Sequence, residues 1–548
     1  MKIINRIIMF YIVSVLLPLC AMGQINLYWD VRFNGTANYY DEGRNIITDN
    51  PGNIYVTGFS YNLGSFEDIT TIKYNSAGVP LWTALYNGSG NSIDKASFIA
   101  ADNAGNVYVS GYTTGSGSSF DYATVKYNSA GVQQWAEVYN GPGNAIDYIT
   151  SMVVDPSGNV YVTGQSYGGF ITQYDIATIK YNSDGVQQWI SRFDGSGSSN
   201  DIGSSLCTDN SGNVIVVGQS FESNSGSYDY ITIKYNSSGD QIRISYYDGP
   251  GNGIDVATAV KSDNAGNIYV TGYSRGTSSQ YDIATVKYNS EGVEQWVSRH
   301  NGAANGNDGA TGLVTDNDGN VFVTGYSGIS GSNYDIAVLK YDSNGIRQWL
   351  RSYNGTANQN DSSASIAIDN QGNICVAGFC NSTGTSKDFV TIKYNTNGTQ
   401  EWLAVYNGSV NEDDVAYSAA FDQNGDVFVT GKTTVPGSTT DILTLKYSTV
   451  SGIDPVNNTP VNGFRLYDNY PNPFNPSTTI KFEIPDKSFV TLKIFDVNGR
   501  EVAEPVKENL QAGLYEYKFN AEDLPSGVYM YNLITEGFAL TKRMMLIK

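Results

Sequence analysis

An aspartate closes the short motif N-G-x-x-N-x-x-D in eight places along the chain, and Asp twice replaces the opening Asn. Carboxylate oxygens bind hard cations such as Ca²⁺, and two carboxylic acids suffice to hydrolyse a polysaccharide. The closing residues are Asp41, Asp94, Asp147, Asp201, Asp255, Asp308, Asp361 and Asp414. Two interpretations are open: the aspartates bind Ca²⁺, or they cap loop amides and pair with lysines. Recurrence in every copy favours the structural interpretation.

Motifs for other chemistry are incomplete. G-x-S-x-G occurs at residues 164–168 and 272–276, but a hydrolase elbow needs a following helix and a histidine in reach, and the only histidine is His300. A single histidine also excludes multi-histidine zinc sites, and no glycine-rich loop carries the Lys-Ser/Thr pair that binds phosphate. We therefore assign no catalytic residue and no cofactor-binding residue from these motifs.

The aspartate motif belongs to a repeat of 53 or 54 residues. One lysine marks each copy: Lys73, Lys126, Lys180, Lys234, Lys287, Lys340, Lys393 and Lys446. Every copy contains four short strand-like runs and no helical period. Repeats of this kind must stack on their neighbours, and four-stranded units repeated radially form a β-propeller. The aspartates lie between the outermost strand of one copy and the innermost strand of the next, which predicts a position near one mouth of the central channel.

The two ends of the repeat region complement each other. Residues 27–35 match the fourth strand of a copy, whereas the eighth copy stops after its third strand at Lys446-Tyr447. We therefore predict that the N-terminal strand closes the last blade, which gives eight four-stranded blades. All seven tryptophans fall at one position of the fourth strand, and this regularity favours packing over sugar binding.

Composition limits the partners and the location. The formal charge is −21, from 53 acidic and 32 basic residues, which disfavours nucleic acid and anionic membranes as partners. Lys2, Arg6 and the apolar run at residues 7–19 predict a signal peptide over residues 1–23, and no transmembrane segment is expected in the mature chain. The three later cysteines, Cys207, Cys375 and Cys380, are predicted to be free thiols.

The period stops near Ser448. We predict a propeller over residues 24–449, a linker over 450–463 and a second domain over 464–548. Alternating runs and the Asn498-Gly499 hairpin signal predict that this second domain is a small immunoglobulin-like β-sandwich. The predicted fold class is all-β, an eight-bladed β-propeller followed by this sandwich.

The repeat resembles the bacterial SBBP β-propeller repeat. The motifs that carry the resemblance are G-N-V-Y-V-T-G and Y-D-I-A-T-I-K-Y-N, and they recur from residue 24 to about residue 449. That family is named for seven blades, so the eight predicted here depart from the name.

The C-terminal segment resembles the sorting domain of type IX secretion substrates. The residues concerned are 470–476 (Y-P-N-P-F-N-P), 495–500 (F-D-V-N-G-R), 524–529 (L-P-S-G-V-Y) and 542–548 (K-R-M-M-L-I-K). The resemblance implies recognition by the type IX machinery and export across the outer membrane of a Bacteroidetes-type bacterium. Release or surface attachment is expected after the domain is removed.

These features predict a secreted or cell-surface scaffold for recognition or adhesion, without enzymatic activity. Its ligand is expected to be a glycan or a surface protein, bound by the divergent loops at residues 112–120, 167–174 and 221–228. Two alternatives stay open: a polysaccharide-degrading enzyme that uses channel-mouth carboxylates, and a purely structural surface component. The absence of an acidic pair that breaks the repeat argues against the enzyme, and the fold alone does not decide.

Overall fold

The chain is all-β in the computed structural model, which describes residues 25–117, 119–196, 199–330, 333–437, 439–449, 455–457, 463–486, 488–510, 512–521, 524–535 and 537–548. The predicted signal peptide, residues 1–23, and most of the predicted linker lie outside the described residues. The described part contains no helix, and hence none of the length and apolar character needed to cross a membrane.

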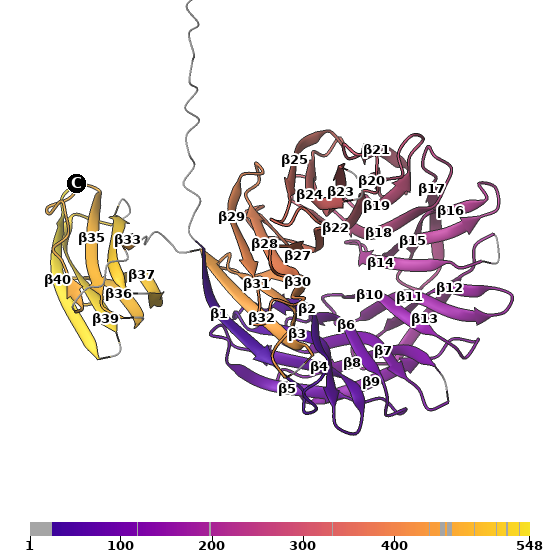
Figure 1. The fold of residues 1–548 in the computed structure, drawn as a ribbon, viewed down its shortest axis with the longest axis horizontal. Coiled ribbons are helices and arrows are strands. Elements are labelled where there is room, and N and C mark those ends of the chain that lie inside the picture. Colours follow the sequence, from indigo (N-terminus) through magenta and orange to yellow (C-terminus); the bar gives the residue numbers. More distant parts are fainter. Residues whose placement is uncertain are drawn as a thin grey trace, which may run out of the picture.

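Eight four-stranded antiparallel sheets occupy the described residues between 25 and 449, arranged around a common centre like the blades of a propeller (Figure 1). The first four are β2 (Asp41–Thr48), β3 (Ile54–Asn62), β4 (Phe66–Tyr74), β5 (Pro80–Tyr86); β6 (Asp94–Ala101), β7 (Val107–Thr114), β8 (Phe120–Tyr127), β9 (Gln133–Tyr139); β10 (Asp147–Val154), β11 (Val160–Gly169), β12 (Gln173–Tyr181), β13 (Gln187–Phe193); and β14 (Ile202–Thr208), β15 (Val214–Glu222), β16 (Ser227–Tyr235), β17 (Gln241–Tyr247).

The remaining four sheets continue this order around the ring. They are β18 (Asp255–Ser262), β19 (Ile268–Arg275), β20 (Tyr281–Tyr288), β21 (Glu294–His300); β22 (Gly309–Thr315), β23 (Val321–Ser330), β24 (Asn333–Tyr341), β25 (Arg347–Tyr353); β26 (Ser362–Ile368), β27 (Ile374–Asn381), β28 (Lys387–Tyr394), β29 (Gln400–Tyr406); and β30 (Val415–Phe421), β31 (Val427–Thr433), β32 (Asp441–Thr449) with β1 (Ile25–Phe33).

The last sheet is completed by the beginning of the chain, as the sequence predicts. β1 pairs antiparallel with β32, from Leu27 opposite Tyr447 to Phe33 opposite Ile442. The first and last sheets also contact each other directly, because Lys432 Nζ lies 3.0 Å from a carboxylate oxygen of Glu42. Pairing β1 in this way protects the edge of β32 that would otherwise be open.

The sheets stack face to face, and their middle strands are buried on both sides. One core cluster joins Tyr161 and Ile176 of the β10–β13 sheet to Val216 and Ile231 of the β14–β17 sheet, and similar clusters join other neighbours. A strand buried on both faces is apolar along its whole length rather than alternating. This explains the continuous run I-Y-V-T-G in β19, where all five residues are buried.

At four of the interfaces a tryptophan and a lysine tie one sheet to the next through one shared carbonyl. The indole N–H of Trp189 donates to the carbonyl oxygen of Ser237 at 3.1 Å, and the Nζ of Lys180 donates to the same oxygen at 3.3 Å. The indole lies against Gly239, where a Cβ atom would come within 2.6 Å of the ring. Equivalent indole bonds are made by Trp29, Trp82, Trp135, Trp296 and Trp349. The packing interpretation of the tryptophans is confirmed.

Trp402 is the exception among the tryptophans. It is 3% exposed, yet its indole N–H has no hydrogen-bond partner within the described residues. The sheet beyond it pairs β32 with β1, and these two strands are not joined by a hairpin turn. The carbonyl that the other indoles use is therefore missing at this one interface.

The C-terminal residues form two further four-stranded sheets around one core. One sheet contains β33 (Pro455–Asn457), β38 (Gly513–Asn520), β35 (Ser477–Ile484) and β34 (Arg465–Leu466); the other contains β37 (Glu501–Leu510), β36 (Ser488–Asp496), β39 (Gly527–Thr535) and β40 (Phe538–Leu546). Ile480, Leu492, Tyr515 and Leu533 from both sheets share the core. β33 lies inside the segment expected to be a linker.

The two ends of the C-terminal segment are joined by backbone bonds. The N–H of Phe474 donates to the carbonyl of Met545 at 2.9 Å, and the N–H of Ile547 donates to the carbonyl of Phe474 at 3.0 Å. The side-chain oxygen of Asn472 accepts the N–H of Met545. The proline-rich motif and the terminal basic-apolar motif are therefore one structural unit.

The tryptophan-to-glycine contact gives a first prediction. Gly185 has φ +83°, and a Cβ there would lie 2.8 Å from the ring of Trp135; Gly212 has φ +75° and nothing within 4 Å of such a Cβ. Gly212→Ala should lower the free energy of unfolding by about 1 kcal/mol, because a residue with a Cβ is strained in the left-handed conformation. Gly185→Ala should lower it by roughly 1–3 kcal/mol more, because the rigid indole of Trp135 must also move. Urea unfolding midpoints measure the difference, and equal losses would contradict the proposed tie.

Candidate functional site

In six of the loops that end in a candidate aspartate, two asparagine side chains bond to each other. In the loop between β9 and β10, the side-chain N–H of Asn140 donates to the side-chain oxygen of Asn144 at 2.6 Å. Asn144 adopts a left-handed conformation with φ 46°, which asparagine tolerates better than most residues. The motif therefore folds the loop back toward the strand that follows it.

Each aspartate then holds its loop against a neighbouring strand. Oδ2 of Asp147 accepts the N–H of Gly141 at 2.7 Å, and Oδ1 accepts the N–H of Tyr167 in β11 at 2.9 Å. The other seven repeat this pair of bonds, as shown by Asp41, Asp94, Asp201, Asp255, Asp308, Asp361 and Asp414. All eight are at most 1% exposed. Both oxygens of every carboxylate therefore cap loop amides.

Burial raises the pKa of seven of these carboxyl groups, Asp41, Asp94, Asp147, Asp201, Asp255, Asp361 and Asp414, more than their hydrogen bonds lower it. The pKa of Asp41 and that of Asp201 are raised to about 6. The main cause is the loss of water around these seven groups, and the charges of other aspartates contribute less.

A second aspartate series opens the third strand of each sheet, and arginines pair with two of its members. Nη2 of Arg192 lies 2.6 Å from an oxygen of Asp175, and Nη2 of Arg299 lies 2.9 Å from an oxygen of Asp282. Each arginine comes from the outermost strand of the same sheet. These pairs are structural ties within a sheet.

The β14–β17 sheet differs from the two sheets with such an arginine. Tyr246 occupies the position that Arg192 and Arg299 hold, and Asp248, like Asp194, replaces the asparagine that opens most of the loops. Relative to the β18–β21 sheet, which has Arg299 and Asn301, one positive charge is lost and one negative charge is gained.

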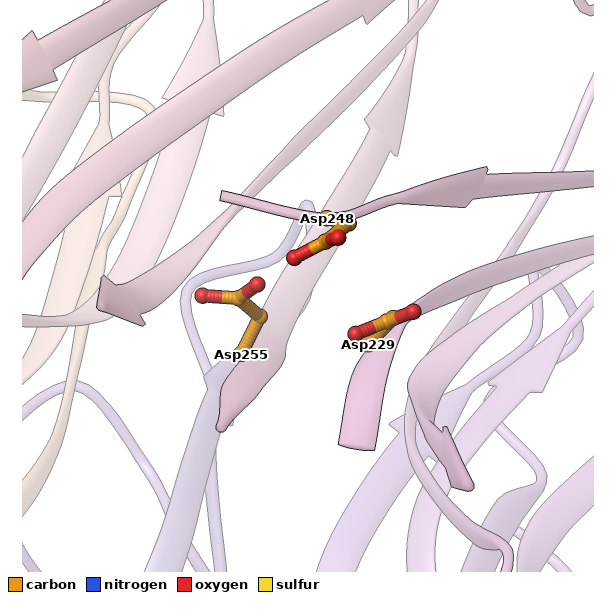
Figure 2. A group of neighbouring side chains, drawn as sticks. All are labelled: Asp229, Asp248 and Asp255. Carbon is orange, nitrogen blue, oxygen red and sulfur yellow. The ribbon is translucent and has the colours of Figure 1, made fainter. Parts of the chain in front are cut away.

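Three carboxylates consequently meet without an arginine between them. Asp229, Asp248 and Asp255 each place an oxygen within 4.8 Å of the others, and Figure 2 shows the three side chains converging. Asp229 is 3% exposed, and its Oδ1 has no hydrogen-bond partner within the described residues. Burial, and then the charges of Asp248, Asp255 and Glu222, raises its pKa to about 6, against a hydrogen bond from Ser225.

Only one of the eight predicted residues, Asp255, belongs to this cluster. The other seven predicted residues occupy equivalent loops around the ring, where each caps its own amides. Sequence reasoning missed Asp229 and Asp248 as a group. The available signal was Asp248 in place of the usual asparagine, two residues after a position that carries no arginine.

Other candidate chemistry falls on buried structural residues. Ser166 and Ser274 of the two G-x-S-x-G motifs are buried. His300 is buried in β21, where its Nε2 lies 3.1 Å from the hydroxyl of Ser327, and burial lowers its pKa. The three cysteines are buried and free, as predicted.

Comparisons with known proteins agree with both resemblances. Residues 468–548 match the secretion system C-terminal sorting domain, and residues 81–117 and 139–171 match a beta-propeller repeat. Fold and matches together define a β-propeller that carries a sorting tail. Two stretches of the repeat region thus match the SBBP repeat, and the tail matches the sorting domain of type IX secretion substrates. This tail implies interaction with the type IX machinery and export to the cell surface or the extracellular space.

Curated relatives match only in part. The regulatory protein FlaEY of Caulobacter vibrioides is 32% identical over 170 residues, which cover 27% of this chain and 17% of that protein. An uncharacterized WD repeat-containing protein, L264, of Acanthamoeba polyphaga mimivirus is 26% identical over 200 residues, which cover 27% of this chain and 14% of that protein. The chain thus spans less than a fifth of the length of these relatives.

Solved structures show distant likenesses. PorZ, described as an essential bacterial surface component of the type IX secretion system of Porphyromonas gingivalis, is 14% identical with a TM-score of 0.37, over 91% of this chain and 74% of that one. The β-propeller domain of the trilobed protease from Pyrococcus furiosus is 8% identical with a TM-score of 0.38, over 64% and 92%. Neither likeness bears on the function of this chain.

The cluster predicts a pH dependence of stability. Because the pKa of folded Asp229 lies above its ordinary value, its stabilising contribution is full below about pH 4 and is lost as the pH rises through about 6. Asp229→Asn removes this loss. Between pH 5 and 7.5 the wild type should therefore lose about 1 kcal/mol more unfolding free energy than the variant. The exposed turn variant Asp184→Asn should follow the wild type, and parallel pH curves for all three would contradict this account.

Calcium binding by the aspartate series stays a prediction, and this cluster tests it most sharply. A divalent cation between the three carboxylates would offset their repulsion. Ca²⁺ added to the chelator-treated chain should then raise the unfolding temperature, and Asp248→Asn, which restores the common residue, should remove that rise. An unchanged unfolding temperature of the wild type would overturn the prediction.

Proposed function

We propose that this protein is a non-enzymatic recognition or adhesion scaffold, which binds a glycan or a surface protein through one end of its propeller. We further propose that the eight sheets form a complete ring of eight blades over residues 24–449. On this proposal, residues 464–548 form an immunoglobulin-like sandwich that serves only export and attachment.

The strand directions define the two ends of the ring. Because neighbouring strands are antiparallel, the asparagine-glycine loops and the connections between second and third strands lie at one end, which we call the loop face. The tight turns between first and second and between third and fourth strands, such as residues 182–185, lie at the opposite end, which we call the turn face. The two faces differ in regularity, since the turn face repeats one sequence and the loop face varies.

Aromatic pairs along the loop face carry the proposal. In five successive sheets, the second and third strands end in two rings whose centroids lie 4.8–5.4 Å apart: Tyr112 with Phe120, Tyr167 with Tyr174, Phe221 with Tyr228, Tyr273 with Tyr281, and Tyr326 with Tyr334. All ten rings are half-buried. Rigid aromatic side chains with one free face provide large contact area for apolar and sugar surfaces.

Exposed apolar residues at the loop tips support the same assignment. Phe170 is 97% exposed and Ile171 is 82% exposed, both in the connection between β11 and β12. Large apolar side chains exposed beside aromatic rings mark interaction surfaces. The carboxylates that the enzymatic alternative requires are by contrast shielded, since Asp229 and Asp255 are buried and only Asp248 of the cluster reaches solvent.

The test separates binding from turnover. Purified chain, incubated with a panel of polysaccharides and glycoproteins, should be retained without releasing reducing ends or peptides. The double variant Phe170→Ser/Ile171→Ser should bind less, because it removes the most exposed apolar contact of the loop face. Val186→Ser, which changes an exposed residue of the turn face, should bind normally.

Two results would contradict the proposal. Release of new reducing ends would favour the polysaccharide-degrading alternative and direct attention to the carboxylates. Absence of both retention and release across the panel would favour the structural surface component.

A further inference from the structure

A cavity of about 380 Å³ lies on the loop face between the β22–β25 and β26–β29 sheets, which are neighbours in Figure 1. Its volume falls within the range of small-molecule sites, about 300–1,000 Å³. The walls come from both sheets and from the loop that joins them. The ring of Tyr334 and the ring of Phe379 supply apolar surface, and amide side chains supply the polar groups.

The amides of this cavity are held in place but keep free hydrogen-bonding capacity. The side-chain N–H of Asn333 donates to the carbonyl of Asn358 at 2.8 Å, and the side-chain oxygen of Asn360 accepts the N–H of Tyr334 at 3.2 Å. Asn381 donates its side-chain N–H to the carbonyl of Asn360. Within the described residues, the remaining polar atom of each side-chain amide, Oδ1 of Asn333, Nδ2 of Asn360 and Oδ1 of Asn381, has no hydrogen-bond partner. The side chain of Gln359 is exposed and likewise has none.

Lys387 supplies the only charge in the wall of the cavity. Its Nζ lies 4.5 Å from the centroid of the Phe379 ring, and it makes no ion pair with any residue that the structure describes. The side-chain carboxylate of Asp413 accepts a hydrogen bond from the backbone N–H of Lys387 and not from its ammonium group. A cation beside free amides and two aromatic rings suits a ligand that carries one negative charge on a polar ring.

Two residues in the wall of the cavity, Lys387 and Gln359, differ from the residues at the same positions in the other copies. The equivalents of Lys387 in the other copies are Glu67, Phe120, Tyr174, Tyr228, Tyr281, Tyr334 and Thr440. The equivalents of Gln359 are Tyr39, Ser92, Ala145, Ser199, Gly253, Gly306 and Glu412. Architecture requires neither residue, since the other sheets form without them. Their coincidence in one copy therefore points to a ligand.

We infer that this cavity binds a single uronic acid unit of a glycan. The carboxylate would pair with the ammonium of Lys387, a charge-assisted bond. The amides of Gln359, Asn360 and Asn381 would bind ring hydroxyls, and the apolar face of the sugar would pack on an aromatic ring. The inference rests on the proposed function, because it names the ligand class of that same loop face.

A matched pair of lysines makes the test sharp. Lys95 also lies over a phenylalanine, with its Nζ 3.9 Å from the centroid of the Phe59 ring, but it is paired with Glu67 at 3.5 Å and lies outside the cavity. Lys387→Met and Lys95→Met therefore make the same chemical change on the same face. Calorimetric titration of the full chain with oligogalacturonate, an alginate oligomer and a hyaluronan oligomer measures the affinity, and the methyl esters serve as neutral analogues.

We expect the wild type to bind at least one acidic oligomer, and to bind its methyl ester about tenfold more weakly. Lys387→Met should lose about tenfold in affinity for the acid, and Lys95→Met should lose none. Lys387→Gln, which keeps a polar side chain, replaces the methionine variant if that one unfolds.

Three outcomes would overturn the inference, and only the third would also overturn the proposed function. Equal affinity for acid and ester with an unaffected Lys387→Met variant would leave a glycan-binding propeller without this site. Retention on glycoproteins alone, with no oligosaccharide bound, would leave protein recognition in place. No retention on any member of the panel would remove both proposals.

Discussion

The structure depends on one constraint: every sheet has two apolar faces and can bury them only against its neighbours. The middle strands are therefore apolar throughout, and a specific contact must fix the distance between sheets. Between the β10–β13 and β14–β17 sheets, the indole of Trp189 packs on the left-handed Gly239, and its N–H and the ammonium group of Lys180 donate hydrogen bonds to one carbonyl oxygen. The indole bond recurs at six interfaces, and a lysine shares its carbonyl at four of them, whereas Arg243 and the unbonded Trp402 occupy the other two.

This constraint decides what could be predicted from sequence. The period, the four strands per copy and the complementary ends predicted the sheets and the pairing of β1 with β32, because these follow from local patterns and from the count of strands. The aspartate series and its amide-capping role could be predicted from recurrence, but the turn that produces the caps could not. Whether Asp147 faces a channel or a loop depends on the left-handed turn at Asn144, which brings Gly141 onto its carboxylate.

The cluster and the cavity were beyond sequence reasoning for a related reason. Asp229, Asp248 and Asp255 are separated along the chain, and only the pairing of β16 with β17 shows that Tyr246 lies where Arg192 and Arg299 lie in their sheets. Lys387 likewise could be recognised as part of a cavity only once the fold placed it beside Phe379 and the loop before β26. A comparison of the eight copies residue by residue would have marked these departures, although not their convergence.

Repetition and function therefore occupy different residues in this molecule. A group that recurs at every interface is explained by the interface, as the capped aspartates and the tryptophans are. A group that occurs once cannot be explained in this way, because the other sheets form without it. Asp248 repels the buried carboxylate of Asp229, which the asparagine of six other copies would not do, and Lys387 places an ammonium group without an ion pair among the described residues where five of the other seven copies have an aromatic ring. Such substitutions offer nothing to the ring itself, so their role is to be sought in what the ring binds.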